Sequence, residues 1–248
     1  MAASSRFLVF QHIDVEHPGI FRDFMREAGI EWDAIELDAG ETVPASFDAY
    51  DALLVMGGPM DVWQEKEHPW FKPEKAAINK WVSARRPYFG FCLGHQLLAD
   101  AMGGKVGKAT TPEVGIHSIE LTAAGKASPI FAGLPSKQEC LQWHGAEVQQ
   151  APAGAQVLAA SPACAIQALS VGERAFSIQF HVEMTDTTVK DWGCVPEYKS
   201  ALENTLGADG LAHFQHETDK RMPVFKRSAR QLFDNFMGTV RAWKRATA

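Results

Sequence analysis

The first half of the chain alternates between two hydrophobic periods. Four short segments are typical of strands, and three of them are unbroken apolar runs, as in strands buried on both faces of a sheet. Three intervening segments carry apolar side chains three and four positions apart, which predicts amphipathic helices. Because strands and helices alternate with short connections, we expect a parallel sheet covered on both faces. The predicted strands span residues 7–10, 32–37, 52–56 and 88–92, and the predicted helices span residues 18–29, 74–86 and 94–102.

The second half is richer in predicted strands. Strand patterns follow one another closely and are separated by Pro-, Gly- and Ser-containing turns, as at 151–154 and 161–162. This spacing favours hairpins, and therefore an antiparallel extension of the parallel sheet. From about Thr185 the pattern becomes helical, and a final helix is predicted from Pro223 to Trp243. The predicted strands span residues 116–121, 139–144, 156–160, 165–169 and 175–181.

Length and composition fit one ordinary globular domain. The 248 residues are 46% hydrophobic and 22% charged, values typical of folded proteins rather than of disordered or fibrous chains. No repeat or obvious linker divides the sequence. We predict a single α/β domain over residues 1–248, with its core at about 6–190 and a C-terminal helical extension at about 190–248.

The charge balance excludes two classes of partner. Because 24 basic residues face 30 acidic ones, the net charge of −6 gives no basic footprint for nucleic acid or for an anionic membrane. No segment approaches the roughly 20 apolar residues of a membrane-spanning helix, and the first apolar run is too short for a secretory signal. We expect a cytoplasmic protein whose partner is a small molecule.

The four cysteines, Cys92, Cys140, Cys164 and Cys194, form no CxxC pair and are too few for a disulfide scaffold in a chain of this length. No cysteine–histidine pairs stand at zinc-ligand spacing, so we expect no metal. The sequence also lacks a GxxxxGK[ST] phosphate loop and a GxGxxG motif, and we expect no bound cofactor. Each cysteine is therefore either a core residue or a reactive group.

Cys92 occupies the most distinctive local pattern. It lies in Gly90-Phe-Cys-Leu-Gly-His-Gln96, where a predicted buried strand becomes a helix. Flanking glycines allow a tight turn that projects the cysteine above the sheet, as in the G-x-nucleophile-x-G elbow. The N-terminus of the following helix would lower the pKa of the thiol. The same pattern also fits a small buried cysteine between two packing glycines.

A second polar pattern ends a later strand, in Ile178-Gln-Phe-His-Val-Glu183. In an extended strand, His181 and Glu183 fall on the same side. The carboxylate can then orient the imidazole while the other ring nitrogen faces the thiol. Taken alone, the pair also fits a hydrogen-bonded histidine beside a solvated carboxylate.

The turn Met56-Gly-Gly-Pro-Met60 follows a predicted parallel strand. Ligands of open α/β sheets bind beyond the carboxyl ends of such strands. A turn at that place can offer backbone N–H groups to an oxyanion, although an ordinary tight turn would have the same sequence.

In this order, Gly57-Gly-Pro59, the 90–96 segment and Gln179-Phe-His-Val-Glu183 resemble the class I glutamine amidotransferases, which use a Cys-His-Glu triad. The resemblance covers roughly Phe7 to Thr188. Trp143-His-Gly145 and the run 152–161 are similar to stand-alone members related to the amidotransferase domain of GMP synthetase. The resemblance implies a flavodoxin-like three-layer α/β fold.

The resemblance also implies roles for individual residues. Cys92 would attack the side-chain amide of glutamine, His181 would carry the thiol proton to the leaving amine, and Glu183 would orient His181. The resemblance assigns the oxyanion hole to the backbone N–H groups of Gly58 and Leu93, and substrate binding to Gly57, Gln96, Trp143 and His144.

The sequence departs from the family in two ways. Val182 stands where the family usually has proline, and since proline only stiffens this turn, the chemistry is expected to persist. Family synthetases also carry an ATP-dependent domain that consumes the ammonia. About 60 residues follow Thr188, which suffice for helices but not for such a domain. We therefore expect the acceptor to be a synthetase partner, water or another γ-glutamyl acceptor.

Three hypotheses for the function remain. The first is a glutaminase-type hydrolase that forms a γ-glutamyl thioester on Cys92 and releases ammonia and glutamate. The second is a γ-glutamyl peptide or γ-glutamyl amide hydrolase that uses the same triad with more room for the leaving group. The third is a non-catalytic, amidotransferase-like regulatory subunit, against which the intact triad argues.

Overall fold

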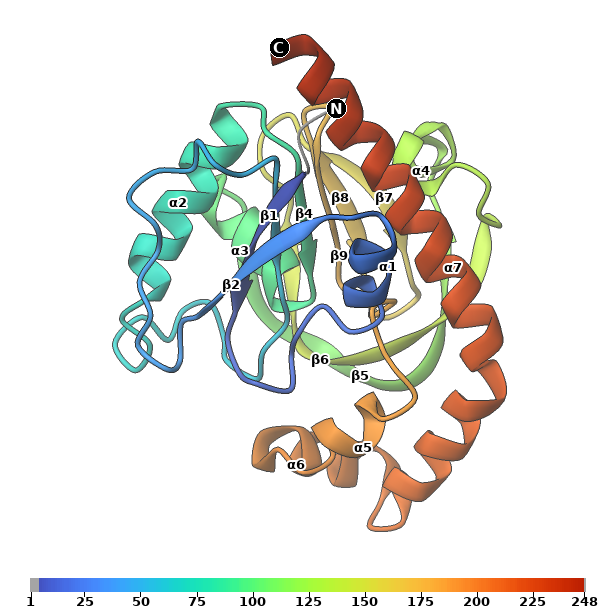
Figure 1. Cartoon of the computed structure of the whole chain (residues 1–248). Coiled ribbons are helices and arrows are strands. Elements are labelled where there is room, and N and C mark those ends of the chain that lie inside the picture. The colour runs from blue at the N-terminus through green and yellow to red at the C-terminus, as the bar shows by residue number, and fades with distance from the viewer. Residues whose placement is uncertain (1–4, 248) are drawn as a thin grey trace.

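A nine-stranded mixed sheet runs through residues 5–247, the part of the chain that this computed structural model describes (Figure 1). The strand order is β2-β1-β3-β4-β9-β8-β7-β5-β6. Neighbours from β2 to β9 are parallel, and those from β9 to β6 are antiparallel. This confirms the expected parallel sheet with an antiparallel extension. The strands are β1 (Arg6–Gln11), β2 (Glu31–Glu36), β3 (Ala52–Val55), β4 (Tyr88–Phe91), β5 (Lys105–Leu121), β6 (Lys137–Gln150), β7 (Gln156–Ala160), β8 (Ala168–Val171) and β9 (Ala175–Ile178).

Helical layers cover both faces of the parallel strands, because these strands are apolar on both faces. In β1, Phe7 and Val9 belong to one core cluster, and Leu8 and Phe10 to the other. Helices α1 and α7 pack on the first cluster, and α2 and α3 on the second. Figure 1 accordingly shows α2 and α7 on opposite sides of the strands. The bounds are α1 (Phe21–Glu27), α2 (Phe71–Ser83), α3 (Leu93–Ala101), α4 (Ala123–Ala127), a 3-10 turn (Pro129–Phe131), α5 (Thr188–Trp192), α6 (Pro196–Leu206) and α7 (Gly210–Thr247).

Four elements differ most clearly from the sequence prediction. Helix α7 begins at Gly210 and continues through Pro223, because buried residues on both sides of the proline pack on the core and outweigh its missing N–H. Strands β5 and β6 are longer than predicted, since the outer half of β5 is largely exposed and lacks an apolar alternation. Strand β8 starts later than predicted, because a bulge in β7 shifts its pairing.

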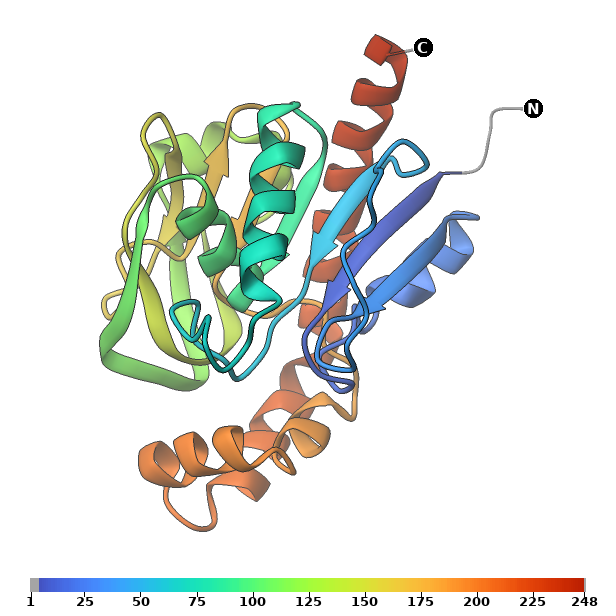
Figure 2. The same cartoon turned by 90° about the vertical axis from the view of Figure 1, so that its left-hand side faces the viewer.

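The C-terminal extension is part of the packed core. Helices α5 and α6 gather at one end of the molecule (Figure 2), where Trp192 and Tyr198 pack against Trp143 of β6. Farther along, Phe233 and Phe236 of α7 join the core cluster of the parallel strands. Within residues 5–247, no helix is both long enough and apolar enough to cross a membrane.

Candidate active site

Cys92 stands alone between β4 and α3, in a conformation that non-glycine residues rarely adopt. Its φ of 47° and ψ of −100° are expected to cost about 1–3 kcal/mol, which the surrounding structure must supply. The flanking glycines are required by close packing. A Cβ on Gly90 would lie 2.6 Å from the Gly94 carbonyl oxygen, and one on Gly94 would lie 2.1 Å from the Val55 carbonyl oxygen. The sequence therefore builds the expected elbow.

His181 and Glu183 form the expected pair. The chain leaves the sheet after β9, and the His181 N–H donates to the Leu141 carbonyl at 2.9 Å. The His181 Nδ1 lies 2.7 Å from Glu183 Oε1, while Glu183 Oε2 accepts from the Val182 N–H at 2.9 Å. Because Nδ1 donates to the carboxylate, Nε2 is free to accept a proton. This atom is buried and has no hydrogen-bond partner within residues 5–247.

The thiol and the imidazole interact electrostatically. Burial alone would lower the pKa of His181, but the Glu183 carboxylate and then Cys92 outweigh it, so the pKa lies well above its ordinary value. Burial raises the pKa of the Cys92 thiol, and His181 offsets part of this rise. The expectation of a lowered thiol pKa was therefore wrong, because desolvation dominates at a side chain that is 4% exposed.

Two backbone N–H groups beside Cys92 have no acceptor within residues 5–247. Leu93 is the first residue of α3, and its N–H has no acceptor among the described residues, whereas the N–H groups of Cys92 and Gly94 donate to backbone carbonyls. The Gly58 N–H is likewise without an acceptor in the described part of the chain. A Cβ on Gly58 would lie 2.9 Å from Leu93 Cδ2, so the two residues are adjacent.

A buried histidine fixes the direction of the Gly58 N–H. His12 Nδ1 lies 2.9 Å from the Gly57 carbonyl oxygen, and its Nε2 lies 2.9 Å from Glu74 Oε1. The Gly57 carbonyl and the Gly58 N–H belong to one planar trans peptide and point in opposite directions. Since His12 holds the carbonyl, the N–H is directed away from His12.

A cavity of about 340 Å³ opens above Cys92. Of the predicted site residues, Cys92, Gly58, Gln96, Trp143 and His144 line it. Gly57, Leu93, His181 and Glu183 are not among its lining residues. The other lining residues are Pro59, Met60, Asp61, Lys108, Gly145, Ala146, Tyr198 and Ala201.

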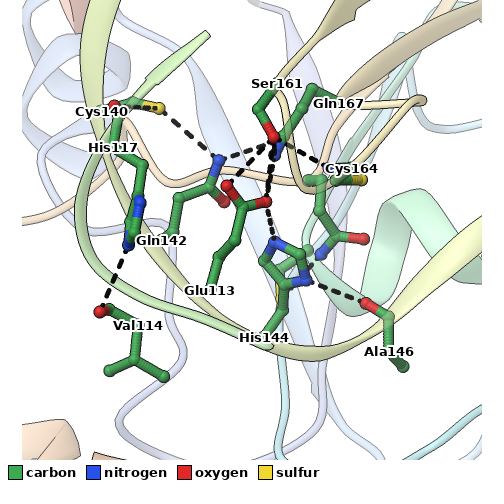
Figure 3. A network of polar contacts seen from close by, with 12 residues as sticks. Glu113, Val114, His117, Cys140, Gln142, His144, Ala146, Ser161, Cys164 and Gln167 are labelled. Carbon is green, nitrogen blue, oxygen red and sulfur yellow. Dashed lines mark hydrogen bonds and ion pairs between the residues drawn. The ribbon is translucent and has the colours of Figure 1, made fainter. Parts of the chain in front are cut away.

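Both ring nitrogens of His144 face protein acceptors. Nδ1 lies 3.0 Å from the Ala146 carbonyl oxygen, and Nε2 lies 3.3 Å from Glu113 Oε2. Figure 3 shows Glu113 between this ring and the side chains of Ser161 and Gln167, which both donate to its carboxylate. Although burial opposes it, the interaction with His144 lowers the pKa of Glu113. His144 therefore lines the cavity as a ring that is hydrogen-bonded through Nδ1 and lies beside the Glu113 carboxylate at Nε2.

A further buried carboxyl group at this site was not predicted from the sequence. Glu16 is 1% exposed, and its Oε1 accepts from the Tyr198 hydroxyl at 2.5 Å. Oε2 is buried without a partner within residues 5–247, and a Cβ on Gly57 would lie 2.5 Å from it. Burial raises the pKa of Glu16 to about 7, although His181 and Tyr198 act in the opposite direction. No local pattern marks this residue.

Glu16, His181 and Glu183 also form a group of three potential metal ligands, whose ligand atoms lie within 4.8 Å of one another. Two of these residues are the hydrogen-bonded pair beside Cys92. The group therefore coincides with the candidate active site.

A cysteine on a nucleophile elbow facing a histidine–carboxylate pair is the arrangement used for acyl transfer in cysteine enzymes. The model of the family "Glutamine amidotransferase class-I" matches residues 20–191, and this chain belongs to that family. The resemblance found in the motifs is thereby confirmed.

Individual relatives fall into more than one functional group. The glutamine amidotransferase-like protein YfeJ of Salmonella typhimurium strain LT2 is 33% identical over 201 residues, which cover 79% of this chain and 82% of YfeJ. The glutamine-hydrolyzing GMP synthase of Aeropyrum pernix is 33% identical over 167 residues, which cover 66% of this chain and 30% of the synthase. Gamma-glutamyl peptidase 3 of Arabidopsis thaliana is 27% identical over 169 residues, which cover 66% of this chain and 67% of the peptidase.

The fold has close counterparts among solved structures. A glutamine amidotransferase from Methylobacillus flagellatus matches with a TM-score of 0.86 at 26% identity, over 96% of each chain. Because the match extends over nearly the whole chain, it includes the C-terminal helices.

Proposed function

We propose that this protein hydrolyses the side-chain amide of glutamine through a γ-glutamyl thioester on Cys92. The observation that carries the proposal is the 2.7 Å contact between His181 Nδ1 and Glu183, which leaves Nε2 next to the thiol without a hydrogen-bond partner among the described residues. Family membership supports the same chemistry.

Each residue has a definite task in the proposed mechanism. His181 Nε2 takes the Cys92 proton, and the resulting thiolate attacks the γ-carbonyl carbon. The N–H groups of Gly58 and Leu93 stabilise the oxyanion of the tetrahedral intermediate. His181 then gives its proton to the leaving nitrogen, so that the C–N bond breaks and ammonia departs. Water, deprotonated by His181, finally attacks the thioester, and glutamate and the thiol are formed.

The substrate-binding roles of Gln96, Trp143 and His144 belong to the same proposal. All three line the cavity with Cys92, which supports a contact with the amino-acid end of a bound glutamine. Gly57 contributes indirectly, since its carbonyl fixes the peptide that carries the Gly58 N–H.

A γ-glutamyl peptide or γ-glutamyl amide is the second candidate substrate. The observation that favours it is the similarity to gamma-glutamyl peptidase 3, which extends over 67% of that protein. The match to GMP synthase covers 30% of the synthase, so the use of the ammonia by a separate synthetase partner is a further proposal. Hydrolysis requires no such acceptor.

The two substrates can be separated by one assay. The protein is incubated with glutamine and with γ-glutamyl dipeptides, and glutamate release is followed for both, with ammonia for the first. We expect glutamine turnover that is lost in Cys92→Ala. Turnover of the dipeptides alone would support the second candidate, and no turnover of either substrate would favour the non-catalytic subunit. An undiminished Cys92→Ala variant would refute the nucleophile assignment.

A further inference from the structure

Two buried glutamines connect the cavity wall to the thiol. Gln96 of α3 is 3% exposed, and Gln179, just after β9, is fully buried. Gln179 Nε2 donates to Cys92 Sγ at 3.4 Å, and Gln96 Nε2 donates to Gln179 Oε1 at 3.2 Å. Gln96 Nε2 also donates to the Ala146 carbonyl oxygen at 3.1 Å. The contacts form a continuous chain from β6 to the sulfur.

The orientation of the Gln96 and Gln179 side-chain amides follows from the contact between Gln96 and the Ala146 carbonyl oxygen. A backbone carbonyl only accepts hydrogen bonds, so Gln96 must present its NH₂ group to Ala146. The second proton of that NH₂ group then requires an acceptor, and Gln179 must offer its Oε1. Gln179 therefore presents its own NH₂ group to Cys92.

The anchoring carbonyl is itself held in place. His144 Nδ1 donates to the same oxygen at 3.0 Å, and the Glu113 carboxylate lies 3.3 Å from the other ring nitrogen (Figure 3). Since Glu113 is fixed in turn by Ser161 and Gln167, the antiparallel extension holds the end of the chain of contacts that lies farthest from the thiol.

We propose that Gln179 is a further catalytic residue, whose amide N–H donates a hydrogen bond to the Cys92 sulfur and stabilises it when it is a thiolate. The assignment rests on the proposed role of Cys92 as the nucleophile. The sulfur carries negative charge before it attacks and again when water displaces it from the thioester. A buried charge needs such a donor, because little solvent reaches it.

The test measures alkylation of Cys92 by iodoacetamide as a function of pH, with the modified peptide followed by mass spectrometry. Gln179→Met keeps the approximate shape of the side chain and removes the donor. We expect its pH profile to move upward by about one unit, which is roughly a tenfold slower alkylation at neutral pH. Glutamine turnover at neutral pH should fall in parallel.

A matched control separates this effect from the loss of any buried amide. Gln142 of β6 is equally buried, and its amide donates to Gln167 and to the Cys140 sulfur rather than to Cys92. Gln142→Met should leave the Cys92 profile at its wild-type position. If both variants move the profile equally, or if Gln179→Met leaves it unmoved, the assignment is refuted.

A second variant keeps the test decisive if Gln179→Met does not fold. Gln179→Glu has nearly the same shape and places an acceptor-only, negatively charged group beside the sulfur. We expect it to move the profile further upward, and an unmoved profile would overturn the proposal. Because alkylation needs no substrate, this outcome is independent of glutamine turnover, whose absence in the wild type would refute the proposed function instead.

Discussion

Glu16 shows how burial sets the charge of individual residues around the thiol. Its carboxyl group lies beside His181 and Glu183 and receives one hydrogen bond, from Tyr198. Because water is excluded, the carboxyl keeps its proton up to about pH 7, whereas an exposed glutamate has a pKa near 4.5. Two ionised carboxylates around one imidazole are therefore avoided below that pH.

This raised pKa predicts a pH-dependent stability. Between pH 4.5 and about 7, folded Glu16 holds a proton that the unfolded chain releases. Its contribution to stability is therefore full below this window and is lost as the pH rises through it, by roughly 3 kcal/mol. Glu16→Gln should remove this loss. Urea unfolding of both proteins at about pH 5 and about pH 8 measures it.

The difference between the two proteins isolates Glu16, because every other titrating group is common to both. We expect the wild type to lose stability relative to Glu16→Gln on going from the lower to the higher pH. Parallel pH dependences would show that Glu16 ionises normally in the folded protein.

At the scale of elements, the strand–turn–helix around Cys92 is specified by short-range sequence. An unbroken apolar strand, two glycines and an amphipathic helix lie within the run from β4 to α3, so the elbow could be predicted without tertiary information. The start of α7 could not be predicted, since Pro223 is a local stop signal that long-range packing overrides. The outer half of β5 could not be predicted either. It pairs with β6 but is largely exposed to solvent, so its sequence carries no apolar alternation.

A substitution of Gly94 tests whether the elbow needs close packing between β3 and α3. A Cβ there would lie 2.1 Å from the Val55 carbonyl oxygen, so Gly94→Ala must push β3 and α3 apart. We expect a loss of roughly 3 kcal/mol in the free energy of unfolding, together with the loss of glutamine turnover. Urea unfolding measures the first quantity.

Gly238 of α7 offers a matched control, because a Cβ there meets open space. Gly238→Ala should stabilise the protein by up to about 1 kcal/mol, as expected for a helix interior. Equal stability of Gly94→Ala and the wild type would mean that the elbow does not need the close approach of Gly94 to the Val55 carbonyl oxygen.

For the molecule as a whole, the site is assembled from distant parts of the chain. The Cys92 turn and the His181–Glu183 pair could be predicted because each is a local motif, and parallel strands bring their ends to one edge. Glu16 and Tyr198 could not, since they are 182 positions apart and neither belongs to a motif. Gln179 stands inside a recognised motif, yet its contact with the sulfur depends on Gln96 and Ala146 from other elements.

The C-terminal helices complete the site. Tyr198 of α6 lines the cavity and donates to Glu16, and the Trp192 ring of α5 lies 4.5 Å from the His181 ring. Helix α7 continues from them into the core through Phe233 and Phe236. We propose that the amidotransferase-type core and this extension fold as one domain.

The proposed role of Cys92 is that of a nucleophile toward γ-glutamyl groups. It is tested most directly by treating the protein with a chloroketone analogue of glutamine and locating the adduct by peptide mass spectrometry. We expect one adduct per chain, on Cys92, with protection by glutamine and a much slower reaction in His181→Gln. An adduct distributed over Cys140, Cys164 and Cys194, or no adduct on Cys92, would contradict it.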